Sequence, residues 1–285
     1  MLKSLIKYHY LWFFLIAGNG LAVFLIDADH SKAWLVLMAV GFILLSFLAE
    51  RILPYQTSFN TDMNDSLRDW IHAIVNETLS IVGILMVPFL VSHYSAWDVW
   101  PSDWPLWLQL LLAIVMADIG ITLMHFASHK ITFLWKLHAV HHSVQRMYGF
   151  NGLMKHPLHQ LIESMAGTAP LLLIGVTPEV MSLLAFAVAL QLMLQHSNVD
   201  YAVGPLIHLL AINKLHRFHH INEAGEGDVN FGLFTTLTDR VLGTNVYDGQ
   251  RLFNSIDLGI AKEPHFPNSY LAQLLSPFRV SRREG

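Results

Sequence analysis

Four stretches of this sequence are apolar over lengths close to those needed to cross a lipid bilayer. A membrane-spanning helix requires about 20 largely apolar residues, and the stretches cover residues 10–26, 33–49, 71–91 and 106–124. The composition agrees, because 54% of the 285 residues are hydrophobic and 13% are charged, against about 25% charged in an average soluble protein. We therefore predict an all-α integral membrane protein with four transmembrane helices.

Basic residues in the connecting loops predict the orientation of the chain in the membrane. Lysine and arginine collect on the cytoplasmic side of a bilayer. They precede the first stretch, separate the second from the third and follow the fourth, whereas loop 92–105 contains none. Both termini are therefore predicted to be cytoplasmic. Four tryptophans suit an aromatic belt at the opposite interface: Trp97, Trp100, Trp104 and Trp107.

A further apolar region, residues 161–194, is interrupted by Gly175 and Pro178. Its halves are short for two full crossings, so we predict a re-entrant or interfacial helical hairpin that returns the chain to the cytoplasmic side. The polar residues from Asn222 onward predict a cytosolic cap. Because the sequence has no internal repeat or linker tract, we expect residues 1–285 to form a single membrane domain.

Histidine is the second unusual feature of the sequence. The chain has 17 histidines, as many as lysine and arginine together. Eight of them occur in three motifs, H-F-A-S-H, H-A-V-H-H and H-R-F-H-H. Positions i, i+3 and i+4 share one face of a helix, so each motif projects its imidazoles in one direction. The eight are His125, His129, His138, His141, His142, His216, His219 and His220.

Metal coordination is the interpretation that accounts for eight grouped imidazoles. Unpaired polar groups are costly in apolar surroundings, and neutral imidazole is the commonest metal ligand. One tetrahedral zinc needs only three or four protein ligands, so eight histidines predict two metals within residues 125–248, at the cytoplasmic mouth of the bundle. The chain contains no cysteine, which excludes thiolate sites. A net charge of −4 gives no basis for nucleic-acid binding.

The order of the motifs resembles the fatty acid hydroxylase/sterol desaturase superfamily of membrane di-iron enzymes. The resemblance spans residues 118–248 and includes, besides the three histidine motifs, H-P-L, Q-H-S-N, N-F-G and D-R-V-L-G-T. It implies four transmembrane helices with a cytosolic histidine-rich cap, and the eight motif histidines carry over as metal ligands. It further implies two iron ions (Fe2+/Fe3+) and O2 as co-substrate.

The resemblance also implies the reaction and its partners. The activity expected is hydroxylation or desaturation of a C–H bond in a lipid, such as a fatty acyl chain or a sterol. Because the sequence contains no G-x-G-x-x-G fingerprint after a strand, the electrons are expected from a separate cytochrome b5- or ferredoxin-like reductase chain. The C-terminal Arg-Arg-Glu-Gly lacks a dilysine signal, which favours a bacterial inner membrane over the endoplasmic reticulum.

Two further ligands are expected in such a site, and the family-like segments suggest His196 and His156. His159 stands where the family pattern usually has an acid. The sequence leaves open whether His156 or His159 faces the metals, or whether His159 only hydrogen-bonds a ligand.

Three polar residues are candidates for orienting ligand imidazoles through their free N–H groups: Asp118, Asn230 and Asp239. Asp118 lies seven residues before His125, on the same helical face. A turn or helix cap is the alternative for Asn230 and Asp239, and solvation or pairing with a neighbouring imidazole is the alternative for Asp118.

Other functions are also compatible with grouped histidines. A dizinc membrane hydrolase would need fewer than eight ligands. A metal transporter would place its ligands at mid-membrane, whereas these follow the predicted spans. A bis-histidine haem protein would pair single histidines across helices instead of using H-x-x-H-H triplets.

Overall fold

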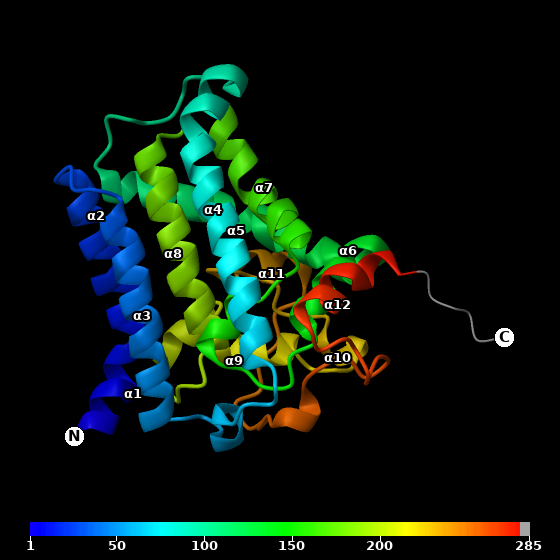
Figure 1. Cartoon of the computed structure of the whole chain (residues 1–285). Coiled ribbons are helices and arrows are strands. Elements are labelled where there is room, and N and C mark those ends of the chain that lie inside the picture. Colours follow the sequence, from blue (N-terminus) through cyan, green and yellow to red (C-terminus); the bar gives the residue numbers. More distant parts are fainter. Residues whose placement is uncertain (280–285) are drawn as a thin grey trace.

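The computed structural model describes residues 1–279, and the regular structure of that range is helical (Figure 1). β-Structure there is limited to three isolated bridges. The predicted all-α class is confirmed. The α-helices are α1 (Leu2–Trp12), α2 (Asn19–Asp27), α3 (Ala33–Ile52), α4 (Ser66–Tyr94), α5 (Leu106–Lys130), α6 (Thr132–His142), α7 (Pro157–Leu173), α8 (Pro178–His196), α9 (Asn213–His219), α10 (Ala224–Gly227), α11 (Leu237–Leu242) and α12 (Tyr270–Leu275).

Five helical segments of the described residues are long and apolar enough to cross a membrane. A π-helical turn, Phe13–Gly18, joins α1 to α2, so that the first segment is continuous from Leu2 to Asp27. This segment, α3, α4 and α5 contain the four predicted stretches, and α8 is the fifth. The helices are longer than the apolar runs because polar first or last turns continue the same backbone hydrogen bonding.

The region predicted as a re-entrant or interfacial hairpin, residues 161–194, contains two helices, α7 and α8. Both helices start with proline at the first helical position, where its missing N–H costs nothing. α8 has the length and hydropathy of a span, and it is the most enclosed of the five segments. Its Leu183, Leu190 and Leu194 are fully buried, so α8 forms the centre of the bundle.

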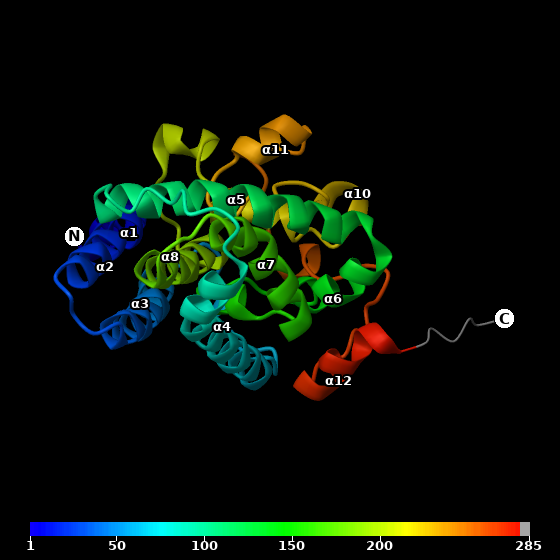
Figure 2. The same cartoon turned by 90° about the horizontal axis from the view of Figure 1, so that it is seen from above.

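The histidine-bearing end of the molecule lies on the same side as the N-terminus (Figure 1). The loop between α2 and α3 and the loop between α4 and α5 lie at the opposite end. Seen from above, α5 runs lengthwise across the molecule beside α8 and α7 (Figure 2). This path carries the last turns of α5 from the apolar bundle to α6 and the cap.

α5 and α7 approach each other closely at two glycines. A Cβ at Gly120 would run into the backbone carbonyl of Ala166, and a Cβ at Gly167 would lie 2.8 Å from the Ile121 side chain. Only glycine fits at such contacts without moving a backbone. The pair therefore fixes how close α5, which carries two histidines, lies to α7.

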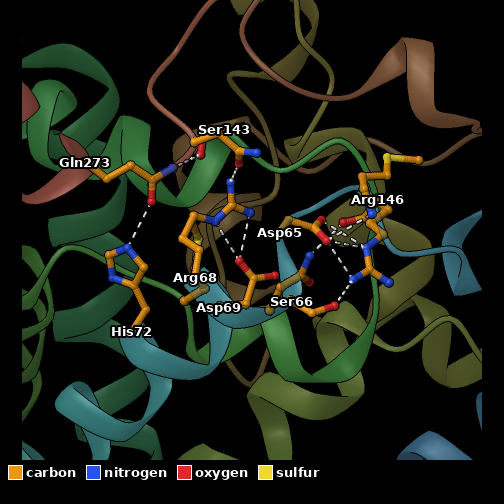
Figure 3. Close-up of polar contacts among 12 residues, drawn as sticks. Asp65, Ser66, Arg68, Asp69, His72, Ser143, Arg146 and Gln273 are labelled. Atoms are coloured by element: carbon orange, nitrogen blue, oxygen red, sulfur yellow. Dashed lines mark hydrogen bonds and ion pairs between the residues drawn. The ribbon is translucent and has the colours of Figure 1, made fainter. Parts of the chain in front are cut away.

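A buried ion pair and a buried hydrogen bond join the start of α4 to segment 143–156, which connects α6 to α7 (Figure 3). The Arg146 guanidinium donates to both Asp65 carboxylate oxygens at 2.8–3.1 Å, and both side chains are nearly fully buried. Arg68 pairs with Asp69, which also accepts a hydrogen bond from the Tyr148 hydroxyl at 2.8 Å. Segment 143–156 between α6 and α7 is thereby held against α4.

Candidate metal centre

The helices bring nine of the ten predicted ligands into two adjacent groups. Within each group the candidate ligand atoms all lie within 4.8 Å of one another. α5 and α6 supply most of group A, and α8 and α9 supply most of group B. Group A consists of His125, His129, His138, His142 and His219, and group B consists of His141, His196, His216 and His220.

In group A, the Nε2 atoms of the imidazoles point at one another. The Nε2 of His138 lies 3.0 Å from that of His125 and 3.0 Å from that of His142. The Nε2 of His142 in turn lies 2.9 Å from that of His219. The i, i+4 spacing of the α5 motif adds His129, whose ring centroid is 5.1 Å from that of His138.

Group B has the same arrangement at slightly longer distances. The Nε2 of His196, the last residue of α8, lies 3.2 Å from the Nε2 of His141 and 3.2 Å from that of His216. The Nε2 of His220 is 3.2 Å from that of His216. Group B therefore joins α6, α8 and α9, and it includes His196 as the sequence predicts.

Backbone carbonyls fix the outer nitrogen of several rings. A carbonyl oxygen only accepts, so an Nδ1 atom beside it carries the proton and leaves the lone pair on Nε2. His125 Nδ1 donates to the Phe231 carbonyl at 2.8 Å, and His219 Nδ1 donates to the Val229 carbonyl at 2.9 Å. The Nε2 lone pairs of these two rings are thereby directed into group A.

The same bonds in group B leave two lone pairs facing each other. His141 Nδ1 donates to the Met154 carbonyl at 3.0 Å, and His196 Nδ1 donates to the Leu192 carbonyl at 3.0 Å. Neither Nε2 atom then carries a proton, so no hydrogen bond can form across the 3.2 Å between the two Nε2 atoms. A cation between the rings satisfies both lone pairs, which is what a metal site requires.

Several buried ring nitrogens have no hydrogen-bond partner within residues 1–279. An unpaired buried polar atom costs about 1–3 kcal/mol, so such atoms are uncommon without a function. One of them is His129 Nε2, whose Nδ1 already donates to Asp228. This pattern fits a donor set completed by bound metal.

The imidazoles outside the spans are held neutral. Burial, followed by the fields of neighbouring imidazoles, lowers the pKa of each ring well below 6.5. Neutral imidazole is the form that coordinates metals. These rings are His138, His141, His142, His216, His219 and His220.

The structure does not bring His156 to either group. His156 precedes Pro157 and caps α7, with its Nδ1 accepting from the Leu158 amide at 3.1 Å and its Nε2 donating to the Leu274 carbonyl at 3.1 Å. Both ring nitrogens are therefore used. His159 instead lies beside group A, with its ring centroid 4.5 Å from that of His138 and its Nε2 2.9 Å from the Ser128 hydroxyl.

The proposed orienting residue Asp118 contacts backbone amides instead of an imidazole. Its carboxylate accepts from the amides of Leu233, Phe234 and Thr235 at 2.7–3.2 Å, and from the Thr235 hydroxyl at 2.6 Å. The physical reason is that the backbone amides of residues 233–235, in the loop before α11, lie in a row beside the Asp118 carboxylate, which accepts their hydrogen bonds. Asp118 therefore acts on the histidines only through the path of this loop.

Asp239 and Asn230 likewise contact backbone groups of the loop and not an imidazole. Asp239 accepts from the amides of Phe231 and Gly232, each at 2.8 Å. Asn230 donates to the Leu215 and Val246 carbonyls and accepts from the Val246 amide. Together they place the Phe231 carbonyl that receives the His125 proton.

The acid that does orient a histidine is Asp228, which the sequence did not single out. Its Oδ1 lies 2.9 Å from His129 Nδ1, and its Oδ2 accepts from Lys130 at 2.7 Å. Partial burial acts to raise the pKa of Asp228, but the hydrogen bonds from His129 and Lys130 outweigh it and lower the pKa to about 2. The available signal was an acid in the glycine-rich loop shortly after the last histidine motif.

A second missed feature is a buried ion pair between the two groups. Lys155 donates to the Glu163 carboxylate, and both side chains are at least nine-tenths buried. They line a space of about 10 Å³ together with histidines of both groups. The space is large enough for little more than a single water molecule.

Comparison with known proteins finds a family for the part of the chain that contains both groups. The family model described as fatty acid hydroxylase matches residues 110–244, a range that contains all nine grouped histidines. This part of the chain belongs to the fatty acid hydroxylase family. Among curated members, the ornithine lipid hydroxylase OlsE of Rhizobium tropici is 29% identical over 282 residues, which are 95% of this chain and 83% of the relative.

Two other relatives match about half of this chain. The alkylglycerol monooxygenase of Danio rerio is 30% identical over 150 residues, which are 51% of this chain and 31% of the relative. The human alkylglycerol monooxygenase is 27% identical over 158 residues, or 34% of its length. This chain thus spans about a third of these two relatives. No solved structure matches the chain.

Proposed function

We propose that this chain is an O2-dependent lipid hydroxylase of the non-haem di-iron type. The observation that carries the proposal is the pair of imidazole groups whose Nε2 atoms converge, with carbonyls binding the outer nitrogen of four of the nine rings. Nine neutral nitrogen donors suit two redox metals better than one zinc. We infer the ligand set to be the nine residues of groups A and B, and we leave out His156.

Two bound irons would supply the reduction of O2 and the attack on an unactivated C–H bond. The chain itself fixes the positions and orientations of the imidazole rings. Carbonyls of residues 154, 192, 229 and 231 hold the rings in one tautomer, and Asp228 holds His129. The small space beside Lys155 and Glu163 limits water between the two groups.

The overall reaction consumes one C–H bond, O2, two electrons and two protons, and yields an alcohol and water. We infer that the electrons come from a separate cytochrome b5- or ferredoxin-like chain. The similarity to an ornithine lipid hydroxylase extends over nearly the whole of both proteins, which supports a lipid with an amino-acid headgroup as the substrate class. We further infer a bacterial inner membrane, with the histidine-rich end in the cytoplasm.

Metal content and lipid composition test this proposal together. Purified protein is expected to hold two irons per chain, and membranes containing it are expected to accumulate a lipid heavier by one oxygen. The variant His141→Ala/His142→Ala removes one ligand from each group and should abolish both. The matched control is His30→Ala, which changes an exposed loop histidine outside both groups.

Other results would point elsewhere. Bound zinc with turnover that does not need O2 would favour a dizinc hydrolase. Loss of two hydrogens from the lipid would change the assignment from hydroxylation to desaturation. No difference in any lipid between wild type and the double variant would contradict the oxygenase.

A further inference from the structure

The short helix α12 and the 3-10 turn that continues it, Ser276–Phe278, have one apolar side that the rest of the described chain leaves uncovered. Three of the side chains are apolar and largely exposed: Leu271, Leu275 and Phe278, at 64%, 48% and 59%. Positions i, i+4 and i+7 share one face of a helix. We call these three residues the apolar face. Gln273 and Pro277, on the other side, are buried.

Hydrogen bonds of a polar side chain hold the buried side of α12 (Figure 3). The Gln273 Oε1 lies 2.9 Å from His72 Nε2. The amide nitrogen of Gln273 donates to the Ser143 hydroxyl at 3.1 Å and to the Pro267 carbonyl at 2.8 Å. A helix on a water-covered surface has the opposite arrangement, with its apolar stripe inside and its polar residues outside. The inverted arrangement of α12 indicates that its outer side is not covered by water.

α12 is attached to two helices of the bundle. His72 belongs to α4, and its ring centroid is 4.6 Å from that of Tyr270 at the start of α12. His156, which caps α7 and belongs to neither metal group, donates from Nε2 to the Leu274 carbonyl at 3.1 Å. The position of α12 is therefore fixed relative to α4 and α7.

These contacts fix the depth of α12 relative to a bilayer. α4 is long and apolar enough to span a membrane, and His72 is the second residue of its apolar stretch 71–91. Gln273 is therefore level with the point where α4 enters the hydrocarbon layer. Seen from above, α12 lies at the edge of the molecule, outside the helices of the bundle (Figure 2). Surrounding lipid would occupy this place.

The same two helices carry exposed apolar side chains further along. Leu79 follows His72 by seven residues, so it lies on the same face of α4, and it is 48% exposed. On α7, Leu161 and Met165 are 57% and 47% exposed. The apolar face of α12 thus lies at the end of surfaces that lipid would cover.

Basic residues follow the apolar face. Arg279 is exposed, and residues 279–285 of the sequence contain three arginines and one glutamate. Arginine has an apolar stem and a charged head, which suits the boundary between acyl chains and headgroups. Basic residues at this boundary attract anionic lipids.

We propose that α12 and the turn after it form a membrane-binding surface. The apolar face inserts into the leaflet on the side of the histidine groups, and the arginines that follow bind the phosphate groups of anionic phospholipids in that leaflet. Helices with a wide apolar face commonly lie in the plane of the interface in this way. The inference does not depend on the proposed function, because no histidine of group A or group B takes part in it.

A fluorescent probe on a single cysteine tests the insertion, since the chain contains no cysteine of its own. The variant Leu275→Cys, labelled with an environment-sensitive fluorophore, is reconstituted into vesicles of phosphatidylcholine and phosphatidylglycerol in equal parts. Lipids with a spin label on the acyl chain should quench this probe. The matched control is Ile256→Cys, which replaces an 82% exposed apolar residue of the cap and should be quenched severalfold less.

Two results would overturn the membrane-binding surface. One is quenching at Leu275 no stronger than at Ile256. The other is a blue-shifted probe at Leu275 that the spin-labelled lipids do not quench, because protein, such as a second copy of this chain, would then cover the apolar face. A thermal midpoint equal to that of wild type in detergent checks that each labelled variant is folded.

The role of the arginines is tested by the composition of the vesicles. Quenching at Leu275 should be weaker in phosphatidylcholine alone than in the mixture, and salt should reduce the difference. The variant Arg279→Gln/Arg282→Gln/Arg283→Gln should lose most of this dependence. The matched control removes three exposed basic residues elsewhere, Lys3→Gln/Arg51→Gln/Lys262→Gln, and should keep it. Equal quenching in both kinds of vesicle without these substitutions would overturn the binding of anionic lipids.

Discussion

Single residues set the direction of an imidazole, and among residues 1–279 Asp228 is the one acid whose carboxylate binds a histidine of group A or group B. The variant Asp228→Asn keeps the shape of the side chain but replaces a charged acceptor of the His129 proton with a weaker one. Loss of such a partner typically lowers metal affinity about 10- to 100-fold. Iron retained against a competing chelator measures the effect.

The neighbouring lysine provides the control for this prediction. Lys130 binds the same carboxylate from the exposed side, where an ion pair contributes about 0–1 kcal/mol. Lys130→Gln should therefore change iron retention little. If both variants lost iron equally, the role of Asp228 would be to pair with lysine and not to orient His129.

Residue-level prediction from sequence works where helical spacing decides the geometry. The i, i+3 and i+4 spacing placed eight histidines on common faces, and the structure brings all eight together with His196. His156 differs because Pro157 starts a helix and turns its imidazole back to cap it. Asp228 escaped notice because a single acid in a loop has no periodicity, and only the fold brings it to His129.

At the scale of elements, the contact between α5 and α7 depends on Gly120. The variant Gly120→Ala adds a methyl group that would run into the Ala166 carbonyl, so the helices must separate. We expect a lower thermal midpoint in detergent and, because α5 carries His125 and His129, a lower iron content. Differential scanning fluorimetry and metal analysis check the two effects.

Gly41→Ala is the matched control for this helix contact. It makes the same change within α3, where a Cβ would meet nothing within 4 Å. Alanine is favoured over glycine in a helix by about 1 kcal/mol, so this variant should be as stable as wild type or slightly more so. Equal destabilisation by both variants would contradict the close α5–α7 contact.

The ion pair between Asp65, at the start of α4, and Arg146 in segment 143–156 gives a second prediction at this scale. Asp65→Ala leaves the guanidinium of Arg146 buried without its main partner, and breaking a buried pair costs about 3–5 kcal/mol. Limited proteolysis should therefore cut segment 143–156 faster in this variant. The double variant Asp65→Ala/Arg146→Met removes the unpaired charge, so it should be cut more slowly than the single one.

The long helices could be predicted from the sequence over the length of their apolar runs. The ends were missed where polar residues continue a helix and are buried by pairing, as Arg68 and Asp69 are in the first turn of α4. α8 was assigned to a short hairpin because Pro178 divides the apolar region, yet its apolar residues form the buried centre of the bundle. The sequence of one segment does not show how far neighbouring helices bury it.

At the scale of the whole molecule, the chain has two ends that should face different compartments. The sequence contains no cysteine, so single cysteines can report the orientation. Cysteines replacing His30 and Trp97 are expected to react with a membrane-impermeant maleimide in intact cells. Those replacing Lys3 and Asp248 should react only after permeabilisation, since basic loops favour the cytoplasmic side. The opposite pattern would place the histidine groups outside the cytoplasm.

The carbonyl anchors of the imidazoles have a consequence for how this centre can change over time. A carbonyl belongs to every amino acid, so the residues at positions 154, 192, 229 and 231 can be exchanged while the rings keep their tautomers. Insertions or deletions in the segments that contain these positions would misdirect a ring at once. The centre should therefore tolerate drift in amino-acid identity but not in loop length, which leaves the adjoining side chains available for adaptation to new lipids.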